Sequence, residues 1–343
     1  MTQQVAILGA GSWGTALAIH LSRCGHDARL WGRNQDVLAA MSADRINQRY
    51  LPDVVLPEAL QITADLAEAL QGVTTIVVAV PSSALEATLD LIRPILAKST
   101  TPATSSERAN ERVSLVWACK GFAGTRLLHE IVYAKFNDMC VPAVLSGPSF
   151  AAELARGLPT ATTIASTSLP LAQRIASVFH GEGFRAYASD DMIGVQLGGA
   201  LKNIYAIATG VSDGLGFGAN TRAALITRGM AEIMRLALPL GGKAETLGGL
   251  SGMGDLVLTC TDDQSRNRRF GLALGRGDAP ADAIDSIDQV VEGARAVVSA
   301  IELARMHEVE LPIANQVYAL VHEGRSAEQA VAQILSRAPT AEF

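Results

Sequence analysis

The sequence has few cysteines, and they are widely spaced. Cys24, Cys119, Cys140 and Cys260 are the four cysteines of the 343-residue chain, and no two of them form a C-x-x-C pair. This spacing argues against a disulfide framework and against a cysteine-based zinc site, and it is typical of a reducing compartment. We therefore expect a cytoplasmic protein that holds no metal.

Long apolar runs and an excess of positive charge are also missing. No stretch approaches the roughly 20 apolar residues that a membrane-spanning helix needs. The first four residues carry no positive side chain, so no signal peptide is expected. Asp and Glu total 34 against 28 Lys and Arg, giving a net charge of -6, so nothing in the overall charge attracts nucleic acid. A local basic cluster could still bind a small phosphate.

Short apolar runs alternate with helical patterns in the first part of the chain, which predicts a parallel sheet with helices on both faces. The chain is long enough for two domains. The expected strands are Val5–Leu8, Ala28–Trp31, Ile76–Val80, Val113–Cys119 and Val141–Leu145, and the first helix is Thr15–Ser22. The polar stretch Ser99–Arg112 is expected to be an exposed loop.

From about Asp190 onward, strand patterns give way to long helical ones. The clearest are Gly194–Ser212, Arg222–Leu240, Gly293–Met306 and Ala327–Ser336. We therefore predict an α/β domain over residues 1–189 and an all-α domain over residues 190–343, with a boundary near residue 190.

A G-x-G-x-x-G sequence, formed by Gly9, Gly11 and Gly14, stands between the first expected strand and the first helix. The first glycine permits a tight turn, the second lets the backbone approach a pyrophosphate, and the third lets helix and strand pack closely. The helix N-terminus would then attract the phosphates. This context predicts a dinucleotide-binding, Rossmann-type doubly wound sheet, while the alternative is a plain structural turn.

Arg33 occupies the place, about 20 residues on, where an acidic residue would bind the ribose of NAD. An arginine instead offers a positively charged guanidinium, whose N–H groups can bind a 2′-phosphate. We therefore expect NADP(H) as cofactor, with NAD(H) as a second cofactor. The alternative is that Arg33 is a solvated side chain after a strand.

Lys202 is the single charged residue between Gln196 and Ser212, within a helical pattern rich in apolar and small residues. A partly desolvated lysine has a lowered pKa and can act as an acid or base. On composition alone, a lysine whose stem packs while its amine reaches water is the commoner case. Gly198, Gly199, Ala206 and Gly210 are small enough to let another element approach this helix closely.

Three further segments combine donors suited to a small phosphate ester. Lys120 follows an expected strand, at the end of the sheet where ligands bind. Ser146–Ala151 is a turn rich in small donors after another strand. The third segment combines the glycine loop and carboxylate of Gly252–Asp255 with the basic Ser265–Arg269. Each segment alone is more often structural.

Taken together, these segments closely resemble the bacterial NAD(P)-dependent glycerol-3-phosphate dehydrogenase family and follow its order. The matching stretches are Gly9–Gly14, Val80–Ser82, Cys119–Gly121, Ser146–Ala151, Leu197–Asn203, Gly214–Gly229, Gly252–Asp255, Ser265–Asn267 and Val290–Gly293. The resemblance implies reversible reduction of dihydroxyacetone phosphate to sn-glycerol 3-phosphate for phospholipid synthesis. It also implies a site between a Rossmann domain and a helical domain, and a homodimer.

The resemblance implies the following roles, carried over position by position. Lys202 is the expected general acid and base. The expected substrate contacts are Lys120, Gly147, Ser149, Lys202, Asp255, Ser265, Arg266 and Asn267. The expected cofactor contacts are Gly9, Gly11, Ser12, Trp13, Gly14, Arg33, Lys120, Ala151, Arg266, Val290 and Glu292.

The chain departs from the family pattern in two places. The stretch around Ser99–Arg112 is longer than the usual connecting loop and is interpreted as a surface insertion. Cys119 stands where the family often has threonine, which removes a possible hydroxyl contact. Two other functions stay open: a dehydrogenase of the same layout with a carboxylate substrate, and a non-catalytic NADP(H) sensor. The joint presence of Lys120, Lys202 and Asp255 argues against a sensor.

Overall fold

The computed structural model describes residues 2–99, 112–136, 139–181, 183–287 and 290–336. The chain divides into two compact units, Met1–Val195 and Gln196–Phe343. The division falls inside helix α8 (Met192–Gly214), which begins just after the boundary expected from the sequence. Residues 100–111 of the expected loop lie outside the described residues.

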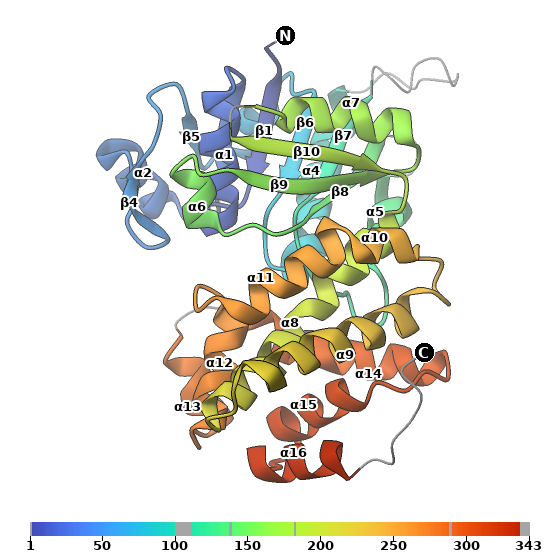
Figure 1. Ribbon diagram of the computed structural model, residues 1–343. Helices are drawn as coiled ribbons and strands as arrows, with labels where there is room; N and C mark the ends of the chain where they lie inside the picture. The colour runs from blue at the N-terminus through green and yellow to red at the C-terminus, as the bar shows by residue number, and fades with distance from the viewer. Residues whose placement is uncertain (1, 100–111, 137–138, 182, 288–289, 337–343) are drawn as a thin grey trace. The chain divides into compact units, whose positions relative to one another are not determined.

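The first unit contains an eight-stranded sheet of order β10-β9-β8-β7-β6-β1-β2-β5 (Figure 1). The five expected strands correspond to β1, β2, β6, β7 and β8, and their neighbouring pairs are parallel, as predicted. Strands β9 and β10 were not predicted, and β9 runs antiparallel to β8. The strands are β1 (Gln4–Leu8), β2 (Asp27–Trp31), β5 (Gln61–Thr63), β6 (Thr75–Val78), β7 (Val113–Trp117), β8 (Cys140–Ser146), β9 (Thr160–Ser166) and β10 (Phe184–Ser189).

Both faces of the sheet are covered by apolar helices, because successive side chains of a strand point to opposite faces. In β1, Val5 and Ile7 join a core with α1 (Ser12–Arg23) and α7 (Leu169–Phe179). Ala6 and Leu8 join the core on the other face with α4 (Leu85–Ser99) and α5 (Leu128–Phe136). This two-sided burial explains why the central strands are nearly continuous apolar runs.

The strand order reverses at β1, which pairs with β2 on one side and with β6 on the other. In open α/β sheets, ligands bind outside the carboxyl ends of the strands at such a point. After β2 the chain forms α2 (Gln35–Asp44) and a small hairpin of β3 (Ile46–Asn47) and β4 (Leu51–Val55). Helix α3 (Leu66–Ala69) and the short α6 (Ala151–Ala155) also belong to this unit.

The second unit is helical, and its described residues contain no strand, which agrees with the sequence prediction. Helix α8 is followed by α9 (Ala219–Ala237), α10 (Ala244–Gly248), a π-helical turn (Leu250–Gly254), α11 (Asp255–Thr261), α12 (Arg266–Gly275), α13 (Pro280–Asp285), α14 (Glu292–Met306), α15 (Pro312–His322) and α16 (Ala327–Leu335). Within the described residues, no helix is both long and apolar enough to cross a bilayer.

Glycines let α8 and α12 touch backbone to backbone. A Cβ added at Gly210 of α8 would lie 2.2 Å from the carbonyl oxygen of Arg268, and one at Gly271 of α12 would lie 2.1 Å from that of Ile207. Real Cβ atoms do not approach oxygen so closely, so both positions require glycine. The close approach expected at Gly210 is confirmed.

A buried carboxylate joins three helices of this unit. Glu232 of α9 accepts a hydrogen bond from the Tyr205 hydroxyl of α8 at 3.1 Å. It also accepts from the backbone N–H groups of Ile313 (2.7 Å) and Ala314 (3.2 Å), in the first turn of α15. Burial raises the pKa of Glu232 to about 7, although the hydrogen bonds from these groups act in the opposite direction.

Replacing Glu232 with Gln should therefore change how stability depends on pH. In the folded protein the pKa of Glu232 lies above the ordinary glutamate value of 4.5. The stability that Glu232 contributes is therefore fully present below pH 4.5 and is lost as the pH rises through about 7. As the pH rises from 5 to 8, the free energy of unfolding of E232Q should increase relative to that of wild type by on the order of 2–3 kcal/mol. Urea unfolding at both pH values measures this difference, and a pH-independent difference would contradict it.

Candidate functional site

The Gly9–Gly14 turn joins β1 to α1 in a conformation that its glycines make possible. Gly9 has a φ of 119°, and a Cβ there would lie 2.5 Å from the carbonyl oxygen of Ala79. A Cβ at Gly14 would lie 1.9 Å from the carbonyl oxygen of Gly9. The first and third glycines therefore have the roles that the sequence pattern assigns to them: a tight turn and a close approach of helix and strand.

Gly11 differs from the other two glycines because the space beside it is open. No atom lies within 4 Å of the position that a Cβ would take. Gly11 is also the N-cap of α1, and no side chain caps this helix end. Ser12 and Trp13 are the first two helical residues, so their backbone N–H groups belong to the helix end that attracts anions. The turn thus fits the pyrophosphate of a dinucleotide.

Arg33 lies beside this turn and is exposed. It follows Gly32, where a Cβ would lie 3.1 Å from the Cβ of Ala10 in the turn. The neighbouring Asn34 is occupied as the N-cap of α2, where its side chain accepts from the backbone N–H of Val37. The end of β2 therefore presents an exposed arginine next to the Gly9–Gly14 turn.

Lys120 and Gly147 come together after the adjacent strands β7 and β8. The Lys120 ammonium donates to the carbonyl oxygen of Gly147 at 3.1 Å, and the Ser149 hydroxyl donates to the same oxygen at 3.1 Å. Gly147 has a φ of 149°, and a Cβ there would lie 2.9 Å from the Cα of Thr162. Ala151 begins α6 just beyond this turn. Four of the expected contact residues therefore lie in this region, beyond the carboxyl ends of β7 and β8.

Lys202 of α8 lies in the interior of the helical unit, with only 7% of its surface exposed. Its ammonium forms an ion pair with the carboxylate of Asp255, which is fully buried, and donates to the Thr259 hydroxyl at 2.7 Å. The Thr259 hydroxyl in turn donates to the backbone carbonyl of Asp255 at 2.6 Å. The ammonium of Lys202 is therefore buried with protein partners, and it does not extend into water as the commoner arrangement of a lysine would.

Gly198 explains why Lys202 faces Asp255. Residues four apart lie on the same face of a helix, so Gly198 and Lys202 point to the same neighbour. A Cβ at Gly198 would lie 2.3 Å from the carbonyl oxygen of Ser251, in the π-helical turn just before α11. The missing side chain lets α8 approach this turn, and Lys202 then reaches the first residue of α11.

Asn267 links the start of α12 to α8 and α14. Its amide nitrogen donates to the side-chain oxygen of Asn203 at 3.0 Å, and its side-chain oxygen accepts from the N–H of Gly293 at 2.8 Å. A Cβ at Gly293 would lie 2.6 Å from the carbonyl oxygen of Asn203. This network places the residue next to Lys202 against the segment that contains Val290 and Glu292.

The basic run Ser265–Arg269 is not a uniform surface. Ser265 is the N-cap of α12, where its hydroxyl oxygen accepts from the N–H of Arg268, while its own proton can still be donated. Arg268 is buried and paired with Asp213 and Asp263. Arg269 is exposed, and Arg266 is half-buried at the first position of the helix. Only Arg266 therefore combines partial burial with a place at the helix N-terminus.

Two polar residues of this network were not among the expected site residues. Thr259 stands between Asp255 and the basic run in the third sequence segment, and no role was assigned to it. It lies four residues after Asp255 and therefore on the same face of α11. Asn203 follows Lys202 directly, but its pairing with Asn267 spans 64 positions and has no local signal. In the first unit, Cys119 is buried, and its thiol donates to the carbonyl oxygen of Val78.

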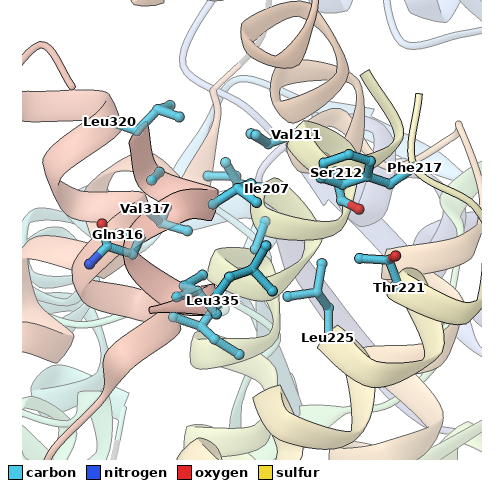
Figure 2. Close-up of a pocket in the computed structure, with 15 residues that line it drawn as sticks. Ile207, Val211, Ser212, Phe217, Thr221, Leu225, Gln316, Val317, Leu320 and Leu335 are labelled. Carbon is cyan, nitrogen blue, oxygen red and sulfur yellow. The ribbon is translucent and has the colours of Figure 1, made fainter. Parts of the chain in front are cut away.

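An apolar pocket of the helical unit has the wrong chemistry for a phosphate ester. Figure 2 shows Ile207 and Val211 of α8, Val317 and Leu320 of α15 and Leu335 of α16 around it. The volume of this cavity is about 90 Å³. Its lining residues include no charged side chain, and Ser212, Thr221 and Gln316 are its polar ones. A phosphate needs charged or multiple polar donors, which the Lys202 region provides instead.

Comparison with known families matches both parts of the chain. Residues 4–172 match the family described as NAD-dependent glycerol-3-phosphate dehydrogenase N-terminus, and residues 191–332 match the corresponding C-terminus family. The chain is 53% identical over 341 residues to glycerol-3-phosphate dehydrogenase [NAD(P)+] of Thioalkalivibrio sulfidiphilus, covering 99% of this chain and 98% of the relative. It is 50% identical to the enzyme of the same name from Halorhodospira halophila, covering 100% and 99%.

A solved structure supports the same assignment. The crystal structure of glycerol-3-phosphate dehydrogenase from Coxiella burnetii is 46% identical, with a TM-score of 0.89, and the match covers 98% of this chain and 99% of that one. The Rossmann-type sheet followed by a helical unit is thus confirmed as the fold.

Replacing Asp255 with Asn should strongly destabilise the protein. The substitution keeps the shape of the side chain but leaves the buried ammonium of Lys202 without its carboxylate, a loss that costs about 3–5 kcal/mol. Urea unfolding followed by circular dichroism measures the change. Asp278→Asn, which makes the same chemical change at an exposed position, serves as control and should stay within about 0.5 kcal/mol of wild type. Equal stability of D255N and wild type would contradict the importance of this ion pair.

Proposed function

The chain belongs to the NAD(P)-dependent glycerol-3-phosphate dehydrogenase family, and from this premise we propose that Lys202 exchanges the proton in its reaction. The enzyme is an oxidoreductase that interconverts glycerol 3-phosphate and dihydroxyacetone phosphate. Bound NAD(P) supplies or accepts the hydride. The observation that carries the proposal is the buried ammonium of Lys202, held by Asp255 and Thr259.

Lys202 is suited to both directions of the reaction. When the carbonyl carbon is reduced, negative charge develops on its oxygen, and the ammonium of Lys202 donates a proton to it. In the reverse direction, the neutral amine accepts the proton of the hydroxyl group. Asp255 and Thr259 hold the nitrogen atom in one place, so that its orientation is set before the substrate binds. A fixed charge of this kind stabilises developing negative charge without reorganisation.

The N-terminal turn of α12 is the proposed holder of the substrate phosphate. Arg266 and Asn267 begin this helix after the cap residue Ser265, and a helix N-terminus attracts anions. Arg266 adds a guanidinium that can bind two phosphate oxygens at once. Binding the phosphate in this way would orient the reacting carbon, so that binding energy supports the chemical step. Asp255 completes the proposed substrate contacts of this unit.

In the first unit, the proposal assigns Lys120, Gly147 and Ser149 to the substrate as well. Their shared hydrogen bonds keep an ammonium and a hydroxyl together beyond the carboxyl ends of β7 and β8. Lys120 would lower the energy of the negative charge that develops on the substrate oxygen. We propose residues 1–189 as the dinucleotide-binding domain and residues 190–343 as the catalytic domain.

The open space at Gly11 and the uncapped start of α1 support the assignment of the turn to the dinucleotide pyrophosphate. The proposed cofactor contacts are Gly9, Gly11, Ser12, Trp13, Gly14, Arg33, Lys120, Ala151, Arg266, Val290 and Glu292. Arg33 favours NADP(H), with NAD(H) as a second cofactor. The proposed setting is a cytoplasmic homodimer that supplies sn-glycerol 3-phosphate for phospholipid synthesis, in line with the family.

Replacing Lys202 with Ala should lower the rate of NADPH oxidation by dihydroxyacetone phosphate about 10²–10⁴-fold, because the proton donor is lost. The affinity for NADPH, measured by its fluorescence on binding, should change little. Lys98→Ala, which removes an exposed lysine from α4, is the matched control and should keep wild-type turnover. Undiminished turnover of a folded K202A enzyme would remove Lys202 from the mechanism.

Replacing Arg33 with Ala should weaken NADPH binding about 10–100-fold, because a charged hydrogen-bonding partner of the 2′-phosphate is lost. Binding of NADH, which lacks this phosphate, should stay within about twofold. Parallel measurement of kcat/KM with the two dinucleotides gives the ratio directly. An equal loss for both dinucleotides would show that Arg33 does not act on the 2′-phosphate.

A further inference from the structure

Asn47 contacts the Gly9–Gly14 turn, although it does not belong to the eight-stranded sheet. It belongs to the β3–β4 hairpin, and only 2% of its surface is exposed. Its amide nitrogen donates to the carbonyl oxygen of Ala10 at 3.1 Å and to the Thr15 hydroxyl at 2.8 Å. One side chain therefore spans the turn from its second residue to the residue that follows Gly14.

Ala10 and Thr15, the two partners of Asn47, flank the central part of the turn. Ala10 precedes Gly11, and Thr15 closes the first helical hydrogen bond of α1 by donating its N–H to the carbonyl oxygen of Gly11 at 2.9 Å. Between them lie the residues whose backbone N–H groups face the phosphates. Because the amide group of Asn47 binds both Ala10 and Thr15, it restrains the distance between these two residues.

The position of Asn47 is set by the protein itself. Its side-chain oxygen accepts from the N–H of Tyr50 at 3.3 Å, which closes the hairpin turn. Before the hairpin, the Arg45 guanidinium donates to the carbonyl oxygen of Leu60 at 3.0 Å. Leu51 of β4 and Leu56, which follows the hairpin, are buried in the core that also contains α1. The hairpin is thus anchored on both sides, and Asn47 meets the turn in one orientation.

We propose that Asn47 is a positioning residue that pre-organises the Gly9–Gly14 turn for the pyrophosphate of the cofactor. The inference rests on the proposed function only in taking this turn as the dinucleotide site. Asn47 acts through the backbone of Ala10 and the side chain of Thr15. The pyrophosphate is common to NADPH and NADH, so Asn47 should affect both dinucleotides equally, unlike Arg33.

Fluorescence titration of the purified enzyme with NADPH and with NADH tests this inference. Asn47→Leu keeps a similar side-chain volume but removes both donors, and it should raise Kd for each dinucleotide by about tenfold. The KM for dihydroxyacetone phosphate should stay within about twofold. An unchanged Kd would overturn the role of Asn47 alone. A wild-type enzyme that bound neither dinucleotide would overturn the assignment of the turn and this inference with it.

A second pair of variants separates positioning from stability. Thr15→Val combined with Asn47→Leu replaces both partners of one buried hydrogen bond by apolar groups, which should restore much of the stability that N47L loses. The carbonyl oxygen of Ala10 still lacks its donor, so the Kd values should remain raised. Ile175→Ala, a core truncation in α7, lowers stability without touching the turn and should leave both Kd values unchanged. Recovery of wild-type Kd in the double variant, or a raised Kd in I175A, would show that stability alone governs binding.

Discussion

The buried ion pair between Lys202 and Asp255 is the interaction on which the helical unit depends. Removing an ammonium and a carboxylate from water costs several kcal/mol for each ion, and only direct contact between them offsets this cost. Direct contact requires α8 to lie against the turn that precedes α11, and only a glycine at position 198 permits this approach. The ion pair of Lys202 therefore requires glycine at position 198, one helical turn earlier on α8.

The same helix presents three polar residues to three different neighbours. Successive residues of a helix point about 100° apart, so Lys202 meets α11, Asn203 meets the start of α12, and Tyr205 meets Glu232 on α9. Each contact satisfies a buried polar group that would otherwise carry a desolvation cost. Glycines on α8 and α12 bring the helix backbones close to their neighbours, so that these side chains reach their partners. Helix α8 is thus the scaffold of the site in this unit.

Features whose cause is local could be predicted from the sequence. The Gly9–Gly14 turn is one of them, because its glycines meet constraints that arise within the turn and at the neighbouring strand end. The central parallel strands are another, since burial on both faces leaves continuous apolar runs. Strands β9 and β10 mix Thr, Ser and Ala with larger residues, and the antiparallel pairing of β9 with β8 is set by tertiary structure. The contact of Asn47 with Thr15 spans 32 positions and leaves no pattern in the sequence.

The basic run after Ser265 shows why a cluster of charges in sequence is not a cluster in space. Arg266, Arg268 and Arg269 are near neighbours in the chain, but the helical period directs them to different surroundings. Arg268 turns inward to Asp213, Arg269 turns to solvent, and Arg266 remains at the helix end. One guanidinium therefore stands at this helix N-terminus, rather than a patch of three. Charge counting could identify the segment, whereas only the helix start at Arg266 distinguishes the arginine suited to an anion.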